Sequence, residues 1–250
     1  MKSVLITFAA AALALGGCSP TNEELVTPER LDRGLVIVLP GIEGEGPLSY
    51  GVRDGLVRAG VDSAVPIYRW GRPVPIAGPL LNQMDVLGNR LAGTRIAQMI
   101  VDYQNAHPDR PVYLIGHSGG GGVAVFAAEA MPAGRAVEGL ILLSASISKT
   151  YDLSSALSRC QKGIVSFYSE ADVALLGIGT TVIGNVDGIR GPSAGLVGFD
   201  TTHAGLHQIG WRQEMGSAGN YGGHMDSAGS AFVTKYVAPW VMASSWPVGG

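Results

Sequence analysis

Residues 112–120 read VYLIGHSGG and decide the fold. The unbroken apolar run from Val112 to Ile115 is typical of a strand that is buried on both faces of a parallel sheet. It leads into Gly116-His117-Ser118-Gly119-Gly120, and a small, apolar segment typical of a helix follows. A Gly-x-Ser-x-Gly sequence in this context predicts a strained strand-to-helix turn that exposes the serine hydroxyl above the carboxyl edge of the sheet. Ser118 is therefore the candidate nucleophile, and the alternative interpretation is a serine that caps the helix.

A second match to the same pattern occurs at Gly191-Pro192-Ser193-Ala194-Gly195. A broken, polar segment precedes Ser193, whereas the apolar residues 196–199 that follow it are typical of a strand. This order is the reverse of the strand-turn-helix order expected around a nucleophilic serine. We call that strand-to-helix turn, residues 116–120, the elbow. Pro192 also fixes φ and removes a donor directly before the serine. The context favours Ser118 over Ser193.

The glycines after Ser118 also match a loose dinucleotide-binding pattern, Gly119-x-Gly121-x-x-Ala124. That fingerprint requires an acidic residue at the end of the next strand, about 20 residues further on. The next expected strand, residues 139–144, leads into Ser144-Ala145-Ser146 without a carboxylate. We therefore expect no cofactor, and we interpret the glycine run as close packing of the helix against the sheet.

The composition is that of a globular protein with a large core, since 46% of the 250 residues are hydrophobic and 15% are charged. The formal net charge of -3 provides no basic excess to neutralise phosphates, which argues against a nucleic-acid partner. The two cysteines, Cys18 and Cys160, are too far apart in the sequence to form a metal-binding pattern. We expect no metal site.

The N-terminus has the parts of a secretory signal peptide over residues 1–17: a charged start, an apolar stretch and small residues. The sequence Leu15-Gly16-Gly17-Cys18 resembles a bacterial lipoprotein box. This resemblance implies that Cys18 carries lipid such as palmitate and anchors the protein to a bacterial membrane, facing the periplasm or the cell surface. Ordinary secretion is the other interpretation, and both imply export. Residues 18–33 are polar and are expected to form a tether, which leaves residues 34–250 as one domain.

Apolar runs and helical periodicity alternate along this domain, which predicts an α/β fold with a mostly parallel sheet and helices on both faces. Strands are expected at 35–39, 64–70, 112–116, 139–144, 163–168 and 196–199, and helices at 50–59, 82–105, 119–131 and 227–241. The order of these elements, with the elbow near the middle and a helix at the end, resembles the α/β-hydrolase family over most of residues 34–243. Residues 145–162 are too few for a large cap domain.

The resemblance implies a catalytic serine, acid and histidine in that order along the chain. Asp172, in the loop after the strand at 163–168, matches the acid, with Glu170 and Asp200 as alternatives. His224, directly before the final helix, matches the histidine, with His203 as its competitor.

The same resemblance implies two backbone N–H groups that bind the oxyanion of a tetrahedral intermediate. One belongs to Gly119, the residue after the nucleophile. The second belongs to the loop after the first strand, at Ile42 or at Glu43.

By resemblance, the chain is expected to be a serine hydrolase that cleaves a small-molecule carboxylic ester through an acyl-enzyme on Ser118. An acyltransferase or thioesterase would use the same residues, and a catalytically silent binding module is the alternative from a different class. Residues 70–75 and 177–195 are expected to supply the wall and lid of the substrate pocket. The sequence leaves the oligomeric state open.

Overall fold

The computed structural model describes residues 21–71, 82–172 and 184–247. The predicted signal peptide, residues 1–17, and the predicted lipidation site, Cys18, lie outside these ranges. The same holds for residues 72–75 of the expected pocket wall and for residues 177–183 of the expected lid.

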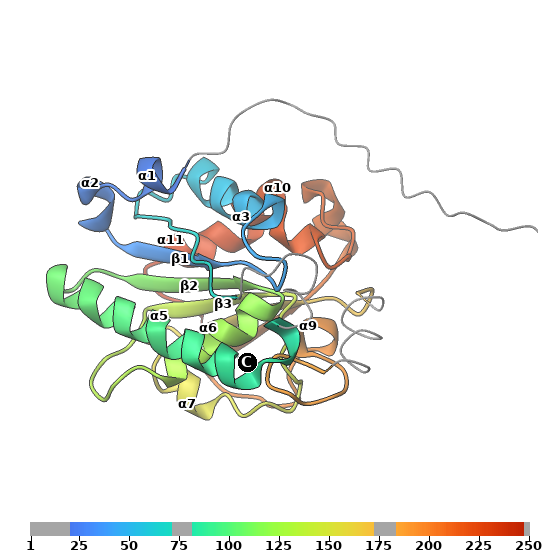
Figure 1. Ribbon diagram of the computed structural model, residues 1–250. Helices are drawn as coiled ribbons and strands as arrows, with labels where there is room; N and C mark the ends of the chain where they lie inside the picture. Colours follow the sequence, from blue (N-terminus) through green and yellow to red (C-terminus); the bar gives the residue numbers. More distant parts are fainter. Residues whose placement is uncertain (1–20, 72–81, 173–183, 248–250) are drawn as a thin grey trace, which may run out of the picture.

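A parallel sheet forms the centre of the molecule (Figure 1). Within the described residues it has five strands, and each strand pairs in parallel with its predecessor in the sequence: β1 (Leu35–Leu39), β2 (Val112–His117), β3 (Gly139–Leu143), β4 (Ile164–Tyr168) and β5 (Leu206–Gly210). The first three are buried along their whole length, as their unbroken apolar runs predict. Because all five strands are parallel, their carboxyl ends meet at one edge of the sheet.

Helices cover both faces of the sheet (Figure 1), as the sequence predicts. Alternate residues of β1 point to opposite faces: Ile37 belongs to one core cluster, and Val36 and Val38 belong to the other. The first face carries α5 (Val86–Ala106) and α6 (Gly119–Glu129). The second face carries α3 (Pro47–Arg58), α10 (Ser230–Phe232), the π-helical turn η4 (Val233–Val237) and α11 (Ala238–Met242). The fold is therefore a three-layer α/β structure.

The connection between β3 and β4 is short. Only α7 (Ser154–Leu157) lies between β3 and β4, so no large cap domain is inserted there. The segments around β5 contain α9 (Ala194–Val197) before it and two 3₁₀ turns, η2 (Gln213–Ala218) and η3 (Asp226–Ala228), after it.

Two of the predicted helices are interrupted. The predicted helix at 82–105 is interrupted at Asp85, whose carboxylate accepts from the N–H of Gly88 at 2.9 Å and caps α5. The predicted helix at 227–241 is divided into η3, α10, η4 and α11. Pro239 has no N–H to continue the α-helical ladder, and the wider π turn precedes it.

Two predicted strands are wrong. Residues 64–70 pair with β1 only at isolated bridges, at Ala64 and Ile67, because Pro66 between them has no N–H to donate. Residues 194–197 form the helix α9, and the last strand of the sheet is β5 instead. That strand contains His207 and Gln208 and is only half-buried at the edge of the sheet, so it lacks the apolar run that marks the central strands.

The predicted tether at 18–33 is wrong from residue 21 onward, because α1 (Asn22–Leu25) and α2 (Pro28–Leu31) pack on the domain. Leu25 is buried, and its carbonyl accepts from the N–H of Val65 at 3.1 Å. The Oδ1 atom of Asn22 accepts from Arg53 at 2.9 Å and from the N–H of Ile67 at 3.2 Å. The polar residue Asn22 thus binds donors of the folded domain. A polar composition alone does not distinguish such a residue from one in a solvated tether.

The glycine run after Ser118 packs closely, as expected. A Cβ on Gly120 would overlap the carbonyl oxygens of Leu39 and Pro40 at the end of β1. Gly120→Ala is therefore expected to destabilise the fold by about 1–3 kcal/mol, since backbone atoms must move. Gly46→Ala is the control, because a Cβ there meets no atom within 4 Å and φ is 178°, a conformation open to any residue. Urea unfolding of both variants checks this, and equal destabilisation would contradict it.

Candidate active site

Ser118 occupies the turn between β2 and α6 in a backbone conformation that residues with a Cβ rarely adopt, with φ 52° and ψ -122°. The surrounding backbone holds this turn. The N–H of Ser118 donates to the carbonyl of Leu143 at 2.9 Å, and its own carbonyl accepts from Gly121 and Ser146, both at 3.0 Å. The hydroxyl makes no capping bond to α6, so the structure contradicts the helix-cap interpretation.

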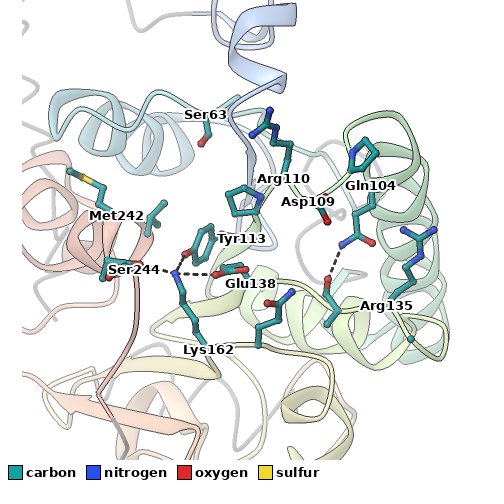
Figure 2. A pocket seen from close by; sticks show the side chains of 17 residues that line it. Ser63, Gln104, Asp109, Arg110, Tyr113, Arg135, Glu138, Lys162, Met242 and Ser244 are labelled. Atoms are coloured by element: carbon teal, nitrogen blue, oxygen red, sulfur yellow. Dashed lines mark hydrogen bonds and ion pairs between the residues drawn. The ribbon is translucent and has the colours of Figure 1, made fainter.

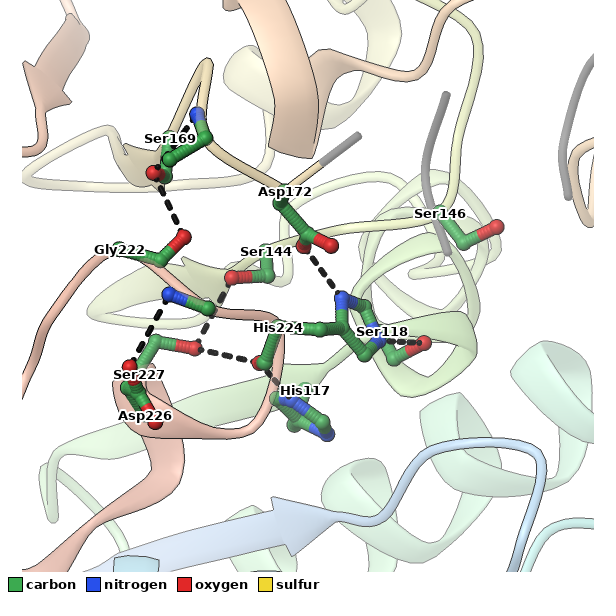
Figure 3. Close-up of polar contacts among 12 residues, drawn as sticks. His117, Ser118, Ser144, Ser146, Ser169, Asp172, Gly222, His224, Asp226 and Ser227 are labelled. Carbon is green, nitrogen blue, oxygen red and sulfur yellow. Dashed lines mark hydrogen bonds and ion pairs between the residues drawn. The ribbon is translucent and has the colours of Figure 1, made fainter. Parts of the chain in front are cut away.

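The hydroxyl instead belongs to a hydrogen-bonded series with His224 and Asp172 (Figure 3). The Oγ atom of Ser118 lies 2.9 Å from Nε2 of His224, and Nδ1 of His224 lies 2.6 Å from Oδ2 of Asp172. Asp172 follows β4, and His224 precedes η3, so three distant parts of the chain meet at the carboxyl edge of the sheet.

The contacts assign a direction to these hydrogen bonds. A carboxylate accepts, so Nδ1 of His224 carries the hydrogen that it donates to Asp172. In the neutral ring Nε2 then has a free lone pair and accepts from the hydroxyl of Ser118. This tautomer can take a proton from Ser118.

The loop that carries His224 is fixed by polar contacts on its other side (Figure 3). Oδ2 of Asp226 accepts from the N–H groups of Tyr221 and Gly223, both at 3.0 Å. The hydroxyl of Ser169, near the end of β4, donates to the carbonyl of Gly222 at 2.8 Å. The loop is thus connected to the segment that carries Asp172.

The competing residues lie elsewhere. His203 precedes β5 and therefore lies at the amino edge of the sheet, where its Nδ1 accepts from the N–H of Gly205 at 3.0 Å. Asp200 forms an ion pair with Lys149 at 3.0 Å, and Glu170 is exposed. Ser193 is fully buried beside Ser148, with which its backbone forms an isolated bridge.

The two predicted oxyanion donors lie close to Ser118. Gly119 is the first residue of α6, so its N–H has no acceptor within the helix. Ile42 follows β1, and among the described residues no backbone carbonyl accepts from its N–H. A Cβ on Gly119 would lie 2.7 Å from the side chain of Ile42, which shows that the two segments are neighbours. The alternative donor, Glu43, is in the same turn.

The side chains around Gly119 are apolar. A Cβ built there would meet Ile42, Trp70 and Val186. Trp70 is buried, and its Nε1 donates to the carbonyl of Pro40 at 2.7 Å, which holds the tryptophan beside the end of β1. The sequence analysis includes Trp70 in the wall and Val186 in the lid segment 177–195, and it names Ile42 only as an oxyanion donor. Val186 stands alone between polar residues, so no periodic pattern marks it.

Glu43 places a second carboxyl group near the site. Its Oε1 lies 4.0 Å from Nδ1 of His117. Burial raises the pKa of Glu43, while backbone N–H groups and the positive form of His224 act in the opposite direction.

His117 is a buried residue beside the site that the sequence analysis does not single out, although its position directly before Ser118 could have signalled it. Burial, together with the nearby His224, lowers the pKa of His117 from its ordinary 6.5 to about 3. The unfolded chain therefore binds a proton below pH 6.5 that the folded protein excludes, and stability falls as the pH falls through this window.

We expect the free energy of unfolding to decrease with falling pH more steeply in the wild type than in His117→Gln, by up to about 1.4 kcal/mol per pH unit. Glutamine has no titration in this range, so the difference between the two curves isolates His117. Urea unfolding at steps between neutral pH and about pH 4 checks the prediction. Parallel curves would contradict it.

A cavity of about 730 Å³ opens at the opposite, amino edge of the sheet (Figure 2). The ammonium group of Lys162 lies in it, where it donates to the hydroxyl of Tyr113 at 2.8 Å and pairs with Glu138 at 3.0 Å. Tyr113 is the second residue of β2, the strand that Ser118 follows, so the cavity lies about one strand length, roughly 17–20 Å, from the serine. This cavity is separate from the site at Ser118.

The described residues contain no group of three or more His, Cys, Asp and Glu side chains that could hold a metal ion. Among the helices of the described ranges, none is both long and apolar enough to cross a membrane.

No protein-family model and no curated protein matches the sequence. Solved structures match it by fold. Lipase B of Aspergillus fumigatus matches over 86% of this chain with a TM-score of 0.54 and 16% identity. The chain spans about half of that lipase, 53% of its length.

Two smaller proteins match over more of their own length. A variant of SOBER1 from Arabidopsis thaliana matches over 83% of this chain and 98% of its own, with a TM-score of 0.47 and 15% identity. Acyl-protein thioesterase 2 of Zea mays matches over 80% of this chain and 89% of its own, with a TM-score of 0.44 and 13% identity. Together, the parallel sheet, the helices on both faces, the strained turn at Ser118 and the likeness to the lipase show that the chain has the α/β-hydrolase fold without a large cap domain.

Proposed function

We propose that the protein is a serine hydrolase that cleaves a carboxylic ester through an acyl-enzyme on Ser118. The observation that carries the proposal is the hydrogen-bonded series from Ser118 through His224 to Asp172, with contacts of 2.9 Å and 2.6 Å. A serine hydroxyl is a weak nucleophile until a neighbouring base takes its proton, and a third group must orient that base. The three side chains have this arrangement.

In the first half of the reaction, Nε2 of His224 takes the proton of Ser118 while Oγ bonds to the ester carbonyl carbon. The carbonyl oxygen becomes an oxyanion, to which the N–H groups of Gly119 and Ile42 donate. The protonated His224, paired with Asp172, then gives its proton to the leaving alcohol, and the acyl group remains on Ser118. In the second half, His224 takes a proton from water, the hydroxide displaces the acyl group as a carboxylic acid, and Ser118 regains its proton.

The substrate of this proposal is a small-molecule ester or another acyl compound. Next to Gly119 lies the partly exposed side chain of Ile42, with the buried side chains of Trp70 and Val186 beside it, and this apolar environment suits an acyl or alkyl group. A thioester or an acceptor other than water would use the same first half-reaction, so thioesterase and acyltransferase activities are variants of this proposal. A silent binding module would need neither the strained serine nor the histidine tautomer that faces it.

A fluorophosphonate probe and a panel of aryl esters with different acyl lengths test the proposal. We expect stoichiometric labelling of Ser118 in the folded wild type and hydrolysis of at least one ester, with mass spectrometry of the digested protein locating the label. Absence of labelling and of hydrolysis would overturn the proposal in favour of the binding module. Transfer of the acyl group to an added alcohol in preference to water would favour the acyltransferase.

Asp172→Asn is expected to lower kcat by about 10⁴-fold, because an amide at this position favours the wrong tautomer of His224. Asp200→Asn is the matched control, since it removes the same charge from a surface ion pair, and kcat should stay within about twofold. Steady-state kinetics on an active ester measure both variants. Equal loss in the two would contradict the role of Asp172.

We also propose that the protein is exported and anchored to a bacterial membrane of the cell envelope by lipid on Cys18. The support is the charged start and apolar stretch of residues 1–17 and the sequence Leu15-Gly16-Gly17-Cys18. Labelling with palmitate and membrane fractionation of a bacterial host, with Cys18→Ser as the control, test this. An unlabelled, soluble wild-type protein would contradict the anchor without affecting the proposed hydrolase.

A further inference from the structure

His117 connects the residue before Ser118 to the backbone of His224. Its side chain is 2% exposed, and its Nε2 lies 3.0 Å from the carbonyl oxygen of His224 (Figure 3). A carbonyl oxygen can only accept, so Nε2 carries the hydrogen and donates it. One side chain thus joins two segments that lie 107 positions apart in the sequence and that carry the two reacting groups of the proposed hydrolase.

The other nitrogen of the His117 ring makes no hydrogen bond to a described residue, so the bond from Nε2 is the one that distinguishes a histidine from an apolar ring at this position. Nδ1 of His117 is buried and has no hydrogen-bond partner among the described residues. The carboxyl of Glu43, in the turn after β1, faces it at 4.0 Å, which is too long for a hydrogen bond. An unpartnered buried nitrogen destabilises the fold, and an apolar ring would avoid that cost. An apolar ring could fill the same space, but it could not donate the hydrogen bond that Nε2 donates to the carbonyl of His224.

The carbonyl of His224 has one other side-chain donor among the described residues. The hydroxyl of Ser227 reaches it at 3.4 Å, and that hydroxyl also contacts Ser144 at 3.0 Å. The contact from His117 is the shorter of the two. The rings of His117 and His224 also pack together, with their centroids 5.0 Å apart. His117 therefore contacts both the backbone and the ring of His224.

We propose that His117 is a positioning residue for His224. It sets the place of the His224 backbone relative to the elbow, so that Nε2 of His224 stays within hydrogen-bond distance of Ser118 while Nδ1 reaches Asp172. The inference rests on the proposed function for its catalytic consequence. Its structural part, the attachment of the His224 loop, stands apart from any activity.

A pair of amide variants tests the proposal. In His117→Gln the amide nitrogen takes the place of Nε2 and can still donate to the carbonyl, whereas in His117→Asn the side chain is one methylene shorter and does not reach it. We expect His117→Asn to lower kcat by about 10- to 100-fold, the usual effect when the partner that orients a reacting group is lost. KM should change by less than about twofold, and His117→Gln should restore kcat to within about threefold of the wild type.

Two readouts separate a positioning role from a general loss of folding. Titration with the fluorophosphonate counts folded sites, so kcat is expressed per labelled serine, and the rate of labelling should fall with kcat in His117→Asn. Amide hydrogen exchange should rise over residues 219–229 in His117→Asn and not in His117→Gln.

Equal kcat and equal exchange in the wild type and His117→Asn would overturn the proposal, as would equal impairment of the two variants. If the wild type neither hydrolyses esters nor takes the label, the proposed function fails. The exchange experiment then decides the attachment of the loop by itself.

Discussion

Replacing Ser118 with alanine is expected to abolish ester hydrolysis, with kcat lower by about 10⁴-fold or more. The change removes the atom that bonds to the acyl group and leaves His224 and the oxyanion donors in place. The residual rate would come from water acting in the same site. Labelling by a fluorophosphonate should disappear completely, because the probe forms its bond with Oγ.

Ser193→Ala is the matched control for this variant. Ser193 stands in the second Gly-x-Ser-x-Gly sequence of the chain, it is buried beside Ser148, and its hydroxyl has no hydrogen-bond partner among the described residues. Its loss should leave labelling and kcat within about twofold of the wild type. If Ser193→Ala and not Ser118→Ala removes the label, the elbow has been assigned to the wrong serine.

Replacing His224 with alanine is expected to lower kcat by about 10⁴- to 10⁶-fold, nearly as much as the loss of the serine, because the residues of such a series act as a unit. The hydroxyl of Ser118 would remain but would have no base at 2.9 Å to take its proton. The measurement is steady-state kinetics on the best ester of the panel, together with the rate of probe labelling.

His203→Ala is the control here, since His203 is the other histidine that the sequence leaves open. It lies before β5, and the carboxyl ends of the strands are at the other edge of the sheet. We expect its activity to remain within about twofold of the wild type. Activity that survives in His224→Ala and is lost in His203→Ala would require a different arrangement of the site.

The sequence predicts the centre of this fold well because its central strands are buried on both faces. β1, β3 and the first four residues of β2 are continuous apolar runs, and the predicted bounds differ from the observed ones by one residue at most. The edge of the sheet is harder to predict. β5 includes His207 and Gln208, which resemble loop residues, whereas the apolar residues 196–199 resemble a strand but contribute to α9 and the turn after it.

The candidate site is predictable where chain order and strand ends specify it. Asp172 and His224 follow from the resemblance to the α/β-hydrolase family, which implies an acid after a strand and a histidine before the final helix, and the structure brings both to Ser118. The contact between His117 and the carbonyl of His224 is not predictable in this way. It joins a side chain to a backbone atom far away in the sequence, and neither residue type nor spacing specifies such a pair.

The order of the strands has a consequence for how the protein is made. Because each strand pairs with the strand that precedes it in the chain, the sheet can grow in the order of synthesis, and no later strand has to insert between two earlier ones. β2 and the elbow can form while the last residues are still unstructured. Asp172 joins after β4, and His224 comes only after β5. In this order the proposed nucleophile precedes its proposed base, and activity is expected to appear only when the residues after β5 have folded.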